Sequence, residues 1–181
     1  MTLITTPRAV IGTSAPDLTL PGTDGKTYQL ASFTNPILVV IFTCNHCPNA
    51  QAVWPRLIRL AHDYRPKGVD FVAINPNDDK NYPEDSFENM QSKAGEWGIN
   101  FPYLRDESQA VAKTYGAVCT PDIFVYDRAR KLAYRGRFDD HWQDEARVTR
   151  HDLRAALDAL LAGNTVAEPQ HPSMGCSIKW Q

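Results

Sequence analysis

An apolar run that ends in a pair of cysteines constrains the fold of this chain most strongly. Residues 37–43 read ILVVIFT, a continuous series of β-branched and aromatic side chains. Such a run is apolar on both faces, which is typical of a central strand covered on both sides. The residues CNHCP follow, and after them apolar side chains recur at helical spacing. We therefore expect a buried strand, the motif Cys44-x-x-Cys47, and a helix that runs to Tyr64 with Pro48 in its first turn.

Strand-like and helix-like segments alternate along the rest of the chain. The expected segments are a hairpin over 18–30, strands at 69–75 and 101–106, helices at 85–98 and 108–116, a hairpin of strands at 121–127 and 131–138, and a last helix near 149–161. This order describes an α/β fold in which a central mixed sheet is flanked by helices on both faces. We expect one domain over residues 1–163 and an extended C-terminal extension, residues 164–181, which carries Cys176.

Composition excludes several classes of partner. The 181 residues carry a formal net charge of -2, and the pI is near 6.2, so neither nucleic acid nor an anionic membrane is expected as a partner. The longest apolar run has the length of a strand, much shorter than a membrane span, and the N-terminus lacks the apolar core of a signal peptide. We expect a cytoplasmic protein. No phosphate-cradling glycine-rich loop is visible, so no organic cofactor is implied.

The two cysteines of the motif favour redox chemistry. A cysteine at the start of a helix faces free backbone N–H groups and the positive end of the helix dipole, which favour thiolate over thiol. A protonated His46 would add positive charge beside both sulfurs. In such sites the thiol pKa can fall from about 8.5 to roughly 3.5–7.5, which stabilises the reduced form and makes the disulfide a better oxidant. The alternative is a pair of buried, inert cysteines at the end of a strand.

A metal site is a second alternative. His46, Cys119 and Cys176 could converge on Cys44 and Cys47, and a cysteine-rich set suits zinc or copper(I). The sequence contains no second C-x-x-C motif that would complete a zinc knuckle. The metal reading is therefore the minority one.

The order of the motifs resembles the thioredoxin-like superfamily. A hairpin, a strand that ends in C-x-x-C and a later Thr-Pro that opens a strand are similar to that fold, and APDLTLPGTDGKTYQL resembles the start of its redoxin branch, the AhpC/TSA proteins. Within that branch, CNHCP and MGCSIKW look most like the peroxiredoxin-like proteins with a CxxC motif. The resemblance covers about residues 11–161. It implies that Cys44 is the attacking thiol, that Cys47 is the resolving one, and that Thr120 and a cis Pro121 form the substrate loop opposite them.

Two features differ from a peroxiredoxin. Those proteins have a threonine three residues before the peroxidatic cysteine, and if Cys47 had that role the position would be occupied by Cys44. Peroxide activation also needs a positioned arginine, for which Arg135 and Arg137 are the candidates. These differences weaken a simple peroxidase reading.

Two features also differ from thioredoxin itself. Thr43 stands where thioredoxins have a tryptophan before the first cysteine. Thioredoxins bury an acid in the central strand as a proton acceptor, and residues 37–42 contain none. Water or His46 would have to accept the proton.

Cys119 and Cys176 leave two possibilities open. One is a relay, in which either thiol takes the disulfide from Cys44–Cys47 by exchange. The other is a structural Cys119–Cys176 bond that holds the C-terminal extension. A third reading of Cys119 alone is a small buried apolar side chain beside the loop.

The function expected from these observations is that of a thiol-disulfide oxidoreductase with a redox-active disulfide. Its partners would be protein or small-molecule disulfides and a thiol reductant. The first alternative is a peroxiredoxin-like thiol peroxidase, an antioxidant that reduces hydroperoxides through a sulfenic acid. The second is a metal-binding or metal-delivery module that uses Cys44, Cys47 and His46.

Overall fold

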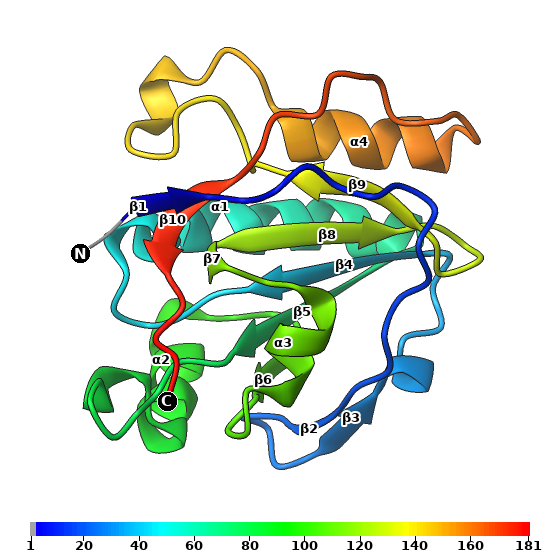
Figure 1. Ribbon diagram of the computed structural model, residues 1–181. Helices are drawn as coiled ribbons and strands as arrows, with labels where there is room; N and C mark the ends of the chain where they lie inside the picture. The colour runs from blue at the N-terminus through cyan, green and yellow to red at the C-terminus, as the bar shows by residue number, and fades with distance from the viewer. Residues whose placement is uncertain (1–2) are drawn as a thin grey trace.

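The computed structural model describes residues 3–181 and consists of a central sheet with helices on both faces (Figure 1). Within this range the main sheet has five strands, which in spatial order are β6 (Tyr103–Arg105), β5 (Val69–Asn75), β4 (Ile37–Phe42), β8 (Asp122–Tyr126) and β9 (Leu132–Gly136). The central strand β4 pairs in parallel with β5 and antiparallel with β8. The sheet is therefore mixed, as the sequence predicts.

The helices lie where helical spacing predicts them. The α-helices are α1 (Pro48–Tyr64), α2 (Phe87–Trp97), α3 (Ala110–Tyr115) and α4 (Asp152–Leu161). Short 3-10 turns are η1 (Leu30–Ser32), η2 (Arg65–Lys67), η3 (Pro83–Asp85) and η4 (Glu145–Arg147). Gly163 lies just beyond α4 with a φ of 78°, a left-handed conformation that glycine adopts without a steric penalty. None of the helices within residues 3–181 is long and apolar enough to cross a bilayer.

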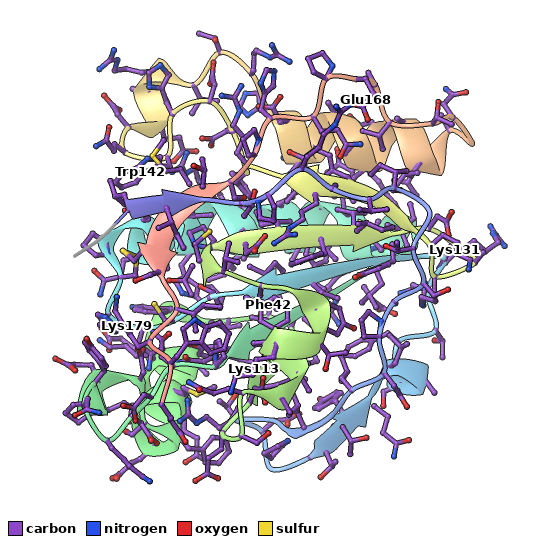
Figure 2. The ribbon with its side chains drawn as sticks, viewed as in Figure 1. Phe42, Lys113, Lys131, Trp142, Glu168 and Lys179 are labelled. Atoms are coloured by element: carbon purple, nitrogen blue, oxygen red, sulfur yellow. A yellow bond between two sulfur atoms is a disulfide. The ribbon has the colours of Figure 1, made fainter. Side chains whose placement is uncertain are left out.

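Strand β4 is central because its side chains supply two cores at once. Every residue of β4 is buried. Val39 and Ile41 pack in the core that includes α1 and α4, while Val40 and Phe42 pack on the opposite face with residues of α3. Burying one such side chain stabilises the fold by roughly 1.5–3 kcal/mol relative to exposure. Phe42 accordingly lies inside the molecule, whereas Lys131 points away from it (Figure 2).

The predicted N-terminal hairpin is present beside β6. Strands β2 (Thr19–Pro21) and β3 (Thr27–Gln29) pair antiparallel. Leu20 of β2 is buried in the same core as α3. The backbone N–H of Thr23 donates to the carbonyl of Tyr103 at 2.9 Å, which attaches the hairpin to the edge of the main sheet.

A second sheet brings the C-terminal extension next to the loop before β8. It contains β1 (Leu3–Thr5), β10 (Met174–Ser177) and β7 (Cys119–Thr120), with β10 in the middle and antiparallel to both neighbours (Figure 1). Ile178 follows β10 and is buried in the core that contains α3. The extension predicted as an extended tail is therefore packed against the rest of the protein. Its boundary at residue 163 stays a prediction.

Candidate redox site

The cysteine motif occupies the junction between β4 and α1, as the sequence predicts. Cys44 lies two residues beyond the end of β4, and Cys47 is the N-cap residue of α1, with Pro48 as the first helical residue. Pro48 fits here because the first N–H groups of a helix have no intrahelical partner. Both cysteines are fully buried, with 0% of their surface exposed. In this state the helix N-terminus is therefore closed off from solvent at the motif.

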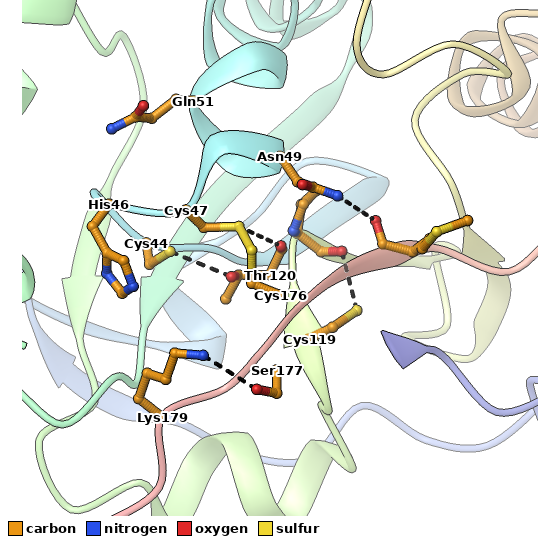
Figure 3. The surroundings of a disulfide bond; sticks show 12 residues. Cys44, His46, Cys47, Asn49, Gln51, Cys119, Thr120, Cys176, Ser177 and Lys179 are labelled. Carbon is orange, nitrogen blue, oxygen red and sulfur yellow. Dashed lines mark hydrogen bonds between the residues drawn. A yellow bond between two sulfur atoms is a disulfide. The ribbon is translucent and has the colours of Figure 1, made fainter. Parts of the chain in front are cut away.

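Cys47 forms a disulfide bond with Cys176 of β10 (Figure 3). Their Cα atoms are 6.3 Å apart, and 129 residues separate them in sequence. Among the described residues, Cys44 and Cys119 are the cysteines that remain thiols. The alternative of a structural Cys119–Cys176 bond is therefore wrong. The Cys44–Cys47 pair is adjacent but not bonded in this state.

The register of the small sheet explains why Cys176 bonds to Cys47 and not to Cys119. Cys176 is paired with Thr120, and Ser177 is paired with Cys119. Paired residues in a sheet point to the same face, and successive residues point to opposite faces. Cys176 and Thr120 therefore share the face toward the motif, and Cys119 points to the other face.

Thr120 contacts both motif sulfurs. Its hydroxyl oxygen lies 3.3 Å from the Sγ of Cys44, and its carbonyl oxygen lies 3.4 Å from the Sγ of Cys47. The Thr120–Pro121 peptide bond is cis, as expected from the resemblance. The structure thus brings Cys44, Cys47, Thr120 and Pro121 together. Their individual roles remain predictions.

The thiol of Cys44 is less acidic than the sequence predicts. Burial raises its pKa to about 12, and the negative charge of Asp85 acts in the same direction. Hydrogen bonds from Thr120 and from the backbone N–H groups of Cys47 and His46 oppose this shift but are weaker. The prediction of a lowered pKa is therefore wrong for this state, because β10 covers the motif and desolvation outweighs the helix N-terminus.

A buried carboxylate that sequence reasoning missed lies beside the motif. Asp85, at the end of η3, is fully buried and accepts hydrogen bonds from the backbone N–H of Asn45 at 2.6 Å and from Nδ1 of His46 at 2.5 Å. The side-chain amides of Asn77 and Asn75 donate to it at 2.7 and 3.3 Å. Burial alone would raise the pKa of Asp85 and is the largest single influence. The hydrogen bonds from His46, Asn77 and Asn45 together outweigh it and hold the pKa below its ordinary value.

The ionised Asp85 determines which ring nitrogen of His46 faces it. A carboxylate can only accept, so Nδ1 of His46 donates this hydrogen bond. Among the described residues no hydrogen-bond partner is found for the buried Nε2 of His46. The ring also stacks on Tyr82, with the ring centroids 5.3 Å apart. The ring of His46 is thereby held in place by one hydrogen bond and one stacking contact.

The sequence did contain a signal for Asp85. The polar run PNDD, residues 76–79, follows β5, and the carboxyl ends of the parallel strands β4 and β5 meet at the same edge of the sheet. Ligands and reacting groups collect at this edge in open α/β sheets. Acidic and amide residues after β5 could therefore have been expected near the cysteines.

The metal set predicted from the sequence does not assemble. Cys176 is bonded to Cys47, and the Sγ of Cys119 contacts the carbonyl of Pro121 at 3.5 Å. Donor atoms of Cys44, His46 and Asp85 do lie within 4.8 Å of one another. This group differs from the predicted set because it includes the carboxylate of Asp85.

The two candidate arginines are both paired with carboxylates. Arg135 donates to both oxygens of Asp122, at 3.2 and 2.7 Å, and to the carbonyl of Gly116 at 2.8 Å. Arg137 donates to Asp152 at 2.7 Å. These guanidinium groups are thus engaged in ion pairs that join β9 to β8 and the residue after β9 to α4.

Two solved structures match nearly the whole chain. A conserved protein from Geobacillus kaustophilus is 49% identical, with a TM-score of 0.96, and the match covers 100% of this chain and 97% of that one. A protein from Sinorhizobium meliloti 1021 is 45% identical, with a TM-score of 0.93 and 98% of each chain covered. The fold described above, including the C-terminal extension, is therefore shared with these proteins.

More distant proteins match the domain without the whole length. The thioredoxin domain of a thiol-disulfide oxidoreductase from Bacteroides vulgatus has a TM-score of 0.60 at 19% identity, over 70% of this chain and 88% of that one, and shows the thioredoxin-like fold. The thiol-disulfide oxidoreductase ResA of Geobacillus thermodenitrificans is 25% identical over 122 residues, which are 67% of this chain and 66% of that protein. The chain thus spans slightly under two thirds of the length of this relative.

The family itself follows from the sequence pattern of the AhpC/TSA family, which matches residues 11–135. This range begins before the N-terminal hairpin, includes the cysteine motif and Thr120, and ends in β9. It corresponds to the greater part of the region in which the sequence resembles redoxins. The chain belongs to the AhpC/TSA family.

Proposed function

We propose that this protein is a thiol-disulfide oxidoreductase that uses the dithiol of Cys44 and Cys47. The thiolate of Cys44 attacks a substrate disulfide and forms a mixed disulfide. The thiolate of Cys47 then attacks Cys44, which forms the Cys44–Cys47 bond and releases the substrate as a thiol. A thiol reductant restores the dithiol. The substrates are disulfides of proteins or small molecules.

One observation carries this proposal more than any other. Three cysteine sulfurs meet at the start of a helix next to Thr120, and two of them are already joined in a disulfide. A purely structural disulfide does not need a further buried thiol packed against it. The relatives named thiol-disulfide oxidoreductase ResA support the same chemistry.

The pair of His46 and Asp85 supplies the proton acceptor that β4 lacks. Because Cys44 is protonated in its buried setting, a base must remove the proton before attack. The side chains of Cys44 and His46 are close enough for transfer through one water molecule. Asp85 is a positioning residue, because it holds the imidazole ring and its Nδ1 proton in place.

Trapping the mixed disulfide tests the proposal. We expect Cys47→Ser, reduced and then mixed with oxidised glutathione or a disulfide-bonded peptide, to accumulate an adduct on Cys44, because the resolving thiol is missing. Peptide mass mapping locates the adduct. Cys119→Ser is the matched control and should not accumulate one. An adduct confined to Cys176 or Cys119 would show that Cys44 is not the attacking thiol.

Membership of the AhpC/TSA family supports a thiol peroxidase as a second candidate. In that case a hydroperoxide would oxidise Cys47 to a sulfenic acid, and Cys44 or Cys176 would resolve it. The test is consumption of hydrogen peroxide with dithiothreitol as donor. A rate no faster than that of Cys47→Ser would exclude peroxidase and antioxidant activity.

Two further properties stay proposals. The donor group of Cys44, His46 and Asp85 supports zinc or copper binding after reduction, and equilibrium dialysis of the reduced protein against each metal alone tests this. A cytoplasmic location is supported by a cysteine content that suits redox or metal chemistry rather than a disulfide scaffold. Fractionation of cells that produce the protein tests it.

A further inference from the structure

Strand β10 occupies the place where an extended substrate segment would pair. The backbone of β7, immediately before Pro121, is paired with Cys176 and Ser177 in antiparallel register. Adding a strand to an exposed edge is a common way to bind an extended peptide. Here the edge is filled by the chain itself, and the cysteine of the added strand is bonded to Cys47.

The sequence of β10 is fitted to this close approach. A Cβ atom on Gly175 would lie 2.2 Å from the carbonyl oxygen of Thr120, so no larger residue fits without a backbone shift. Gly175 precedes the cysteine that reaches the motif. The strand can therefore lie close enough to the loop for Cys176 to reach Cys47.

The segment after β10 is held by the same loop that supplies Asp85. The side-chain amide of Asn77 donates to Asp85 at 2.7 Å, while its oxygen accepts from the backbone N–H of Lys179 at 2.9 Å. The backbone N–H of Asp78 donates to the carbonyl of Lys179 at 2.8 Å. The docked extension thus contacts both the sulfur cluster and the groups around His46, and Figure 3 shows it crossing the site.

The docked strand also closes the site. Cys44 and Cys47 have no exposed surface, and Cys176 is 2% exposed. A disulfide of another molecule cannot contact a sulfur that is completely covered. Chemistry with an outside substrate, as in the function proposed above, therefore requires β10 to leave.

We propose that β10 is a built-in substrate strand and that Cys176 is a third redox residue, which opens and closes the site by exchanging with the Cys44–Cys47 pair. This inference rests on the proposed function and extends it. In the opening step the thiolate of Cys44 attacks the Sγ of Cys47. The Cys47–Cys176 bond breaks, the Cys44–Cys47 bond forms, and the electron pair leaves with the sulfur of Cys176.

The exchange balances within the chain. The proton that Cys44 loses to His46 is returned to Cys176, so one disulfide and one thiol are present before and after, and no outside oxidant is consumed. In the closing step Cys176 attacks Cys47 and restores the buried Cys44 thiol. The outside disulfide that first oxidises the dithiol is the only oxidant in the cycle.

The proposal also indicates the kind of partner that fits. The edge at Thr120 accepts an extended segment in which glycine precedes cysteine, as in the Met-Gly-Cys-Ser sequence of β10. A protein that presents such a segment with its cysteine in a disulfide has the chemistry of β10 itself. A folded helix could not present its backbone to β7 in this way.

Mapping the disulfides across a range of glutathione ratios tests the exchange. After acid quenching and alkylation, the wild-type protein should contain both the Cys47–Cys176 and the Cys44–Cys47 species. Cys176→Ser should contain only Cys44–Cys47, and Cys44→Ala only Cys47–Cys176. Finding Cys47–Cys176 alone in the wild type at every ratio would overturn the proposal and leave a structural bond.

The rate of opening gives an independent test. Dithiothreitol should reduce the Cys47–Cys176 bond at least about tenfold faster in the wild type than in Cys44→Ala, because a neighbouring thiol acts at a high effective concentration. Cys119→Ala is the matched control and should behave as the wild type does. Equal rates in all three proteins would show that Cys44 does not attack the bond.

Gly175→Ala tests the docking of β10 by itself, because all four cysteines remain in this variant. We expect the ratio of Cys47–Cys176 to Cys44–Cys47 to fall by about fivefold or more, because the added methyl group clashes with Thr120. Gly95→Ala, where a Cβ meets nothing within 4 Å, is the control and should not change the ratio. An unchanged ratio in Gly175→Ala would contradict a role for strand docking.

The outcomes distinguish this inference from the proposed function. If Cys176→Ser reduces a peptide disulfide but no exchange is found in the wild type, only the inference fails. If neither Cys176→Ser nor the wild type reduces it, the proposed function fails as well.

Discussion

Two buried thiols lie beside Thr120, and their surroundings differ. Cys44 lies 3.3 Å from the hydroxyl of Thr120, and Cys119 lies in the same short strand as Thr120, with its sulfur 3.5 Å from the carbonyl of Pro121. Burial raises the pKa of both thiols. Neither burial nor the direction of the pKa shift distinguishes the two thiols.

The side chains around Cys44 and Cys119 do distinguish the two thiols. Cys44 belongs to the same buried cluster as Cys47 and Cys176 and lies near His46. The charges that influence the pKa of Cys119 are those of Asp122 and Arg135, which pair with each other. A buried thiol becomes useful when a second sulfur and a proton acceptor are within reach, and we infer that Cys119 is a packing residue.

Replacing each thiol in turn tests the difference between Cys44 and Cys119 most directly. We expect Cys44→Ser to lower disulfide turnover by roughly a thousandfold or more, because a serine hydroxyl is not ionised at neutral pH and cannot form a disulfide. Cys119→Ser should stay within about twofold of the wild type. The measurement is reduction of a disulfide-bonded peptide by the pre-reduced protein. Equal losses in both variants would make Cys119 part of the reaction.

The carboxylate beside Cys44 should matter for stability in a defined pH range. Asp85→Asn should cost roughly 3–5 kcal/mol of unfolding free energy at pH 7, because a buried hydrogen-bonded ion is lost. The pKa of Asp85 is lowered in the folded state, so its contribution is complete above the unfolded value of about 3.9 and is lost as the pH falls. Urea unfolding at pH 7 and pH 2.5 should therefore show a smaller difference between Asp85→Asn and the wild type at pH 2.5.

A kinetic readout separates positioning from mere stability. In Asp85→Asn the rate of mixed-disulfide formation should fall more at pH 7 than at pH 9, where hydroxide can replace the base. A loss that is the same at both pH values would assign Asp85 a structural role only.

The pH dependence of thiolate formation tests the raised pKa of Cys44. Since the pKa of Cys44 is about 12 in the closed state, its thiolate fraction should rise about tenfold for each pH unit between 7 and 10. Because the thiol pKa of Cys44 is raised in the folded state, this thiol contributes fully to the unfolding free energy below its unfolded pKa of about 8.5. The contribution is lost as the pH rises above that value. The ultraviolet absorbance of thiolates in the oxidised protein measures this slope, and Cys119→Ala isolates the part that comes from Cys44. A plateau near pH 7 would contradict the raised pKa.

The smallest effect is expected at the packing thiol itself. Cys119→Ala should lower the unfolding free energy by about 1 kcal/mol, as is common for a buried truncation, without changing the disulfide pattern. Denaturant unfolding with mass mapping checks both expectations. A changed pattern of disulfides would show that Cys119 takes part in disulfide exchange.

Local patterns predicted most of the fold. Strands β4 and β5 and helix α1 were predictable because the apolar period carries that information, and the cis bond before Pro121 was implied by the family resemblance. The contact between Asp85 and His46 spans 39 residues, and the Cys47–Cys176 bond spans 129. Such long-range contacts depend on how loops close, which no periodic pattern encodes. The pKa of Cys44 was mispredicted for the same reason, because its burial comes from a strand at the other end of the chain.

The pairing of β1 with β10 has a practical consequence for work on this protein. Leu3 is opposite Cys176 in that pairing, and the backbone N–H of Thr6 donates to Ser173 at 3.0 Å. At the other end, the backbone N–H of Gln181 donates to the side chain of Gln109 at 3.0 Å. An affinity tag at either end is therefore close to β10, which carries Cys176, or to the segment that follows β10. The choice of tag becomes an experimental variable, and redox measurements on tagged and tag-free protein should be compared before either is interpreted.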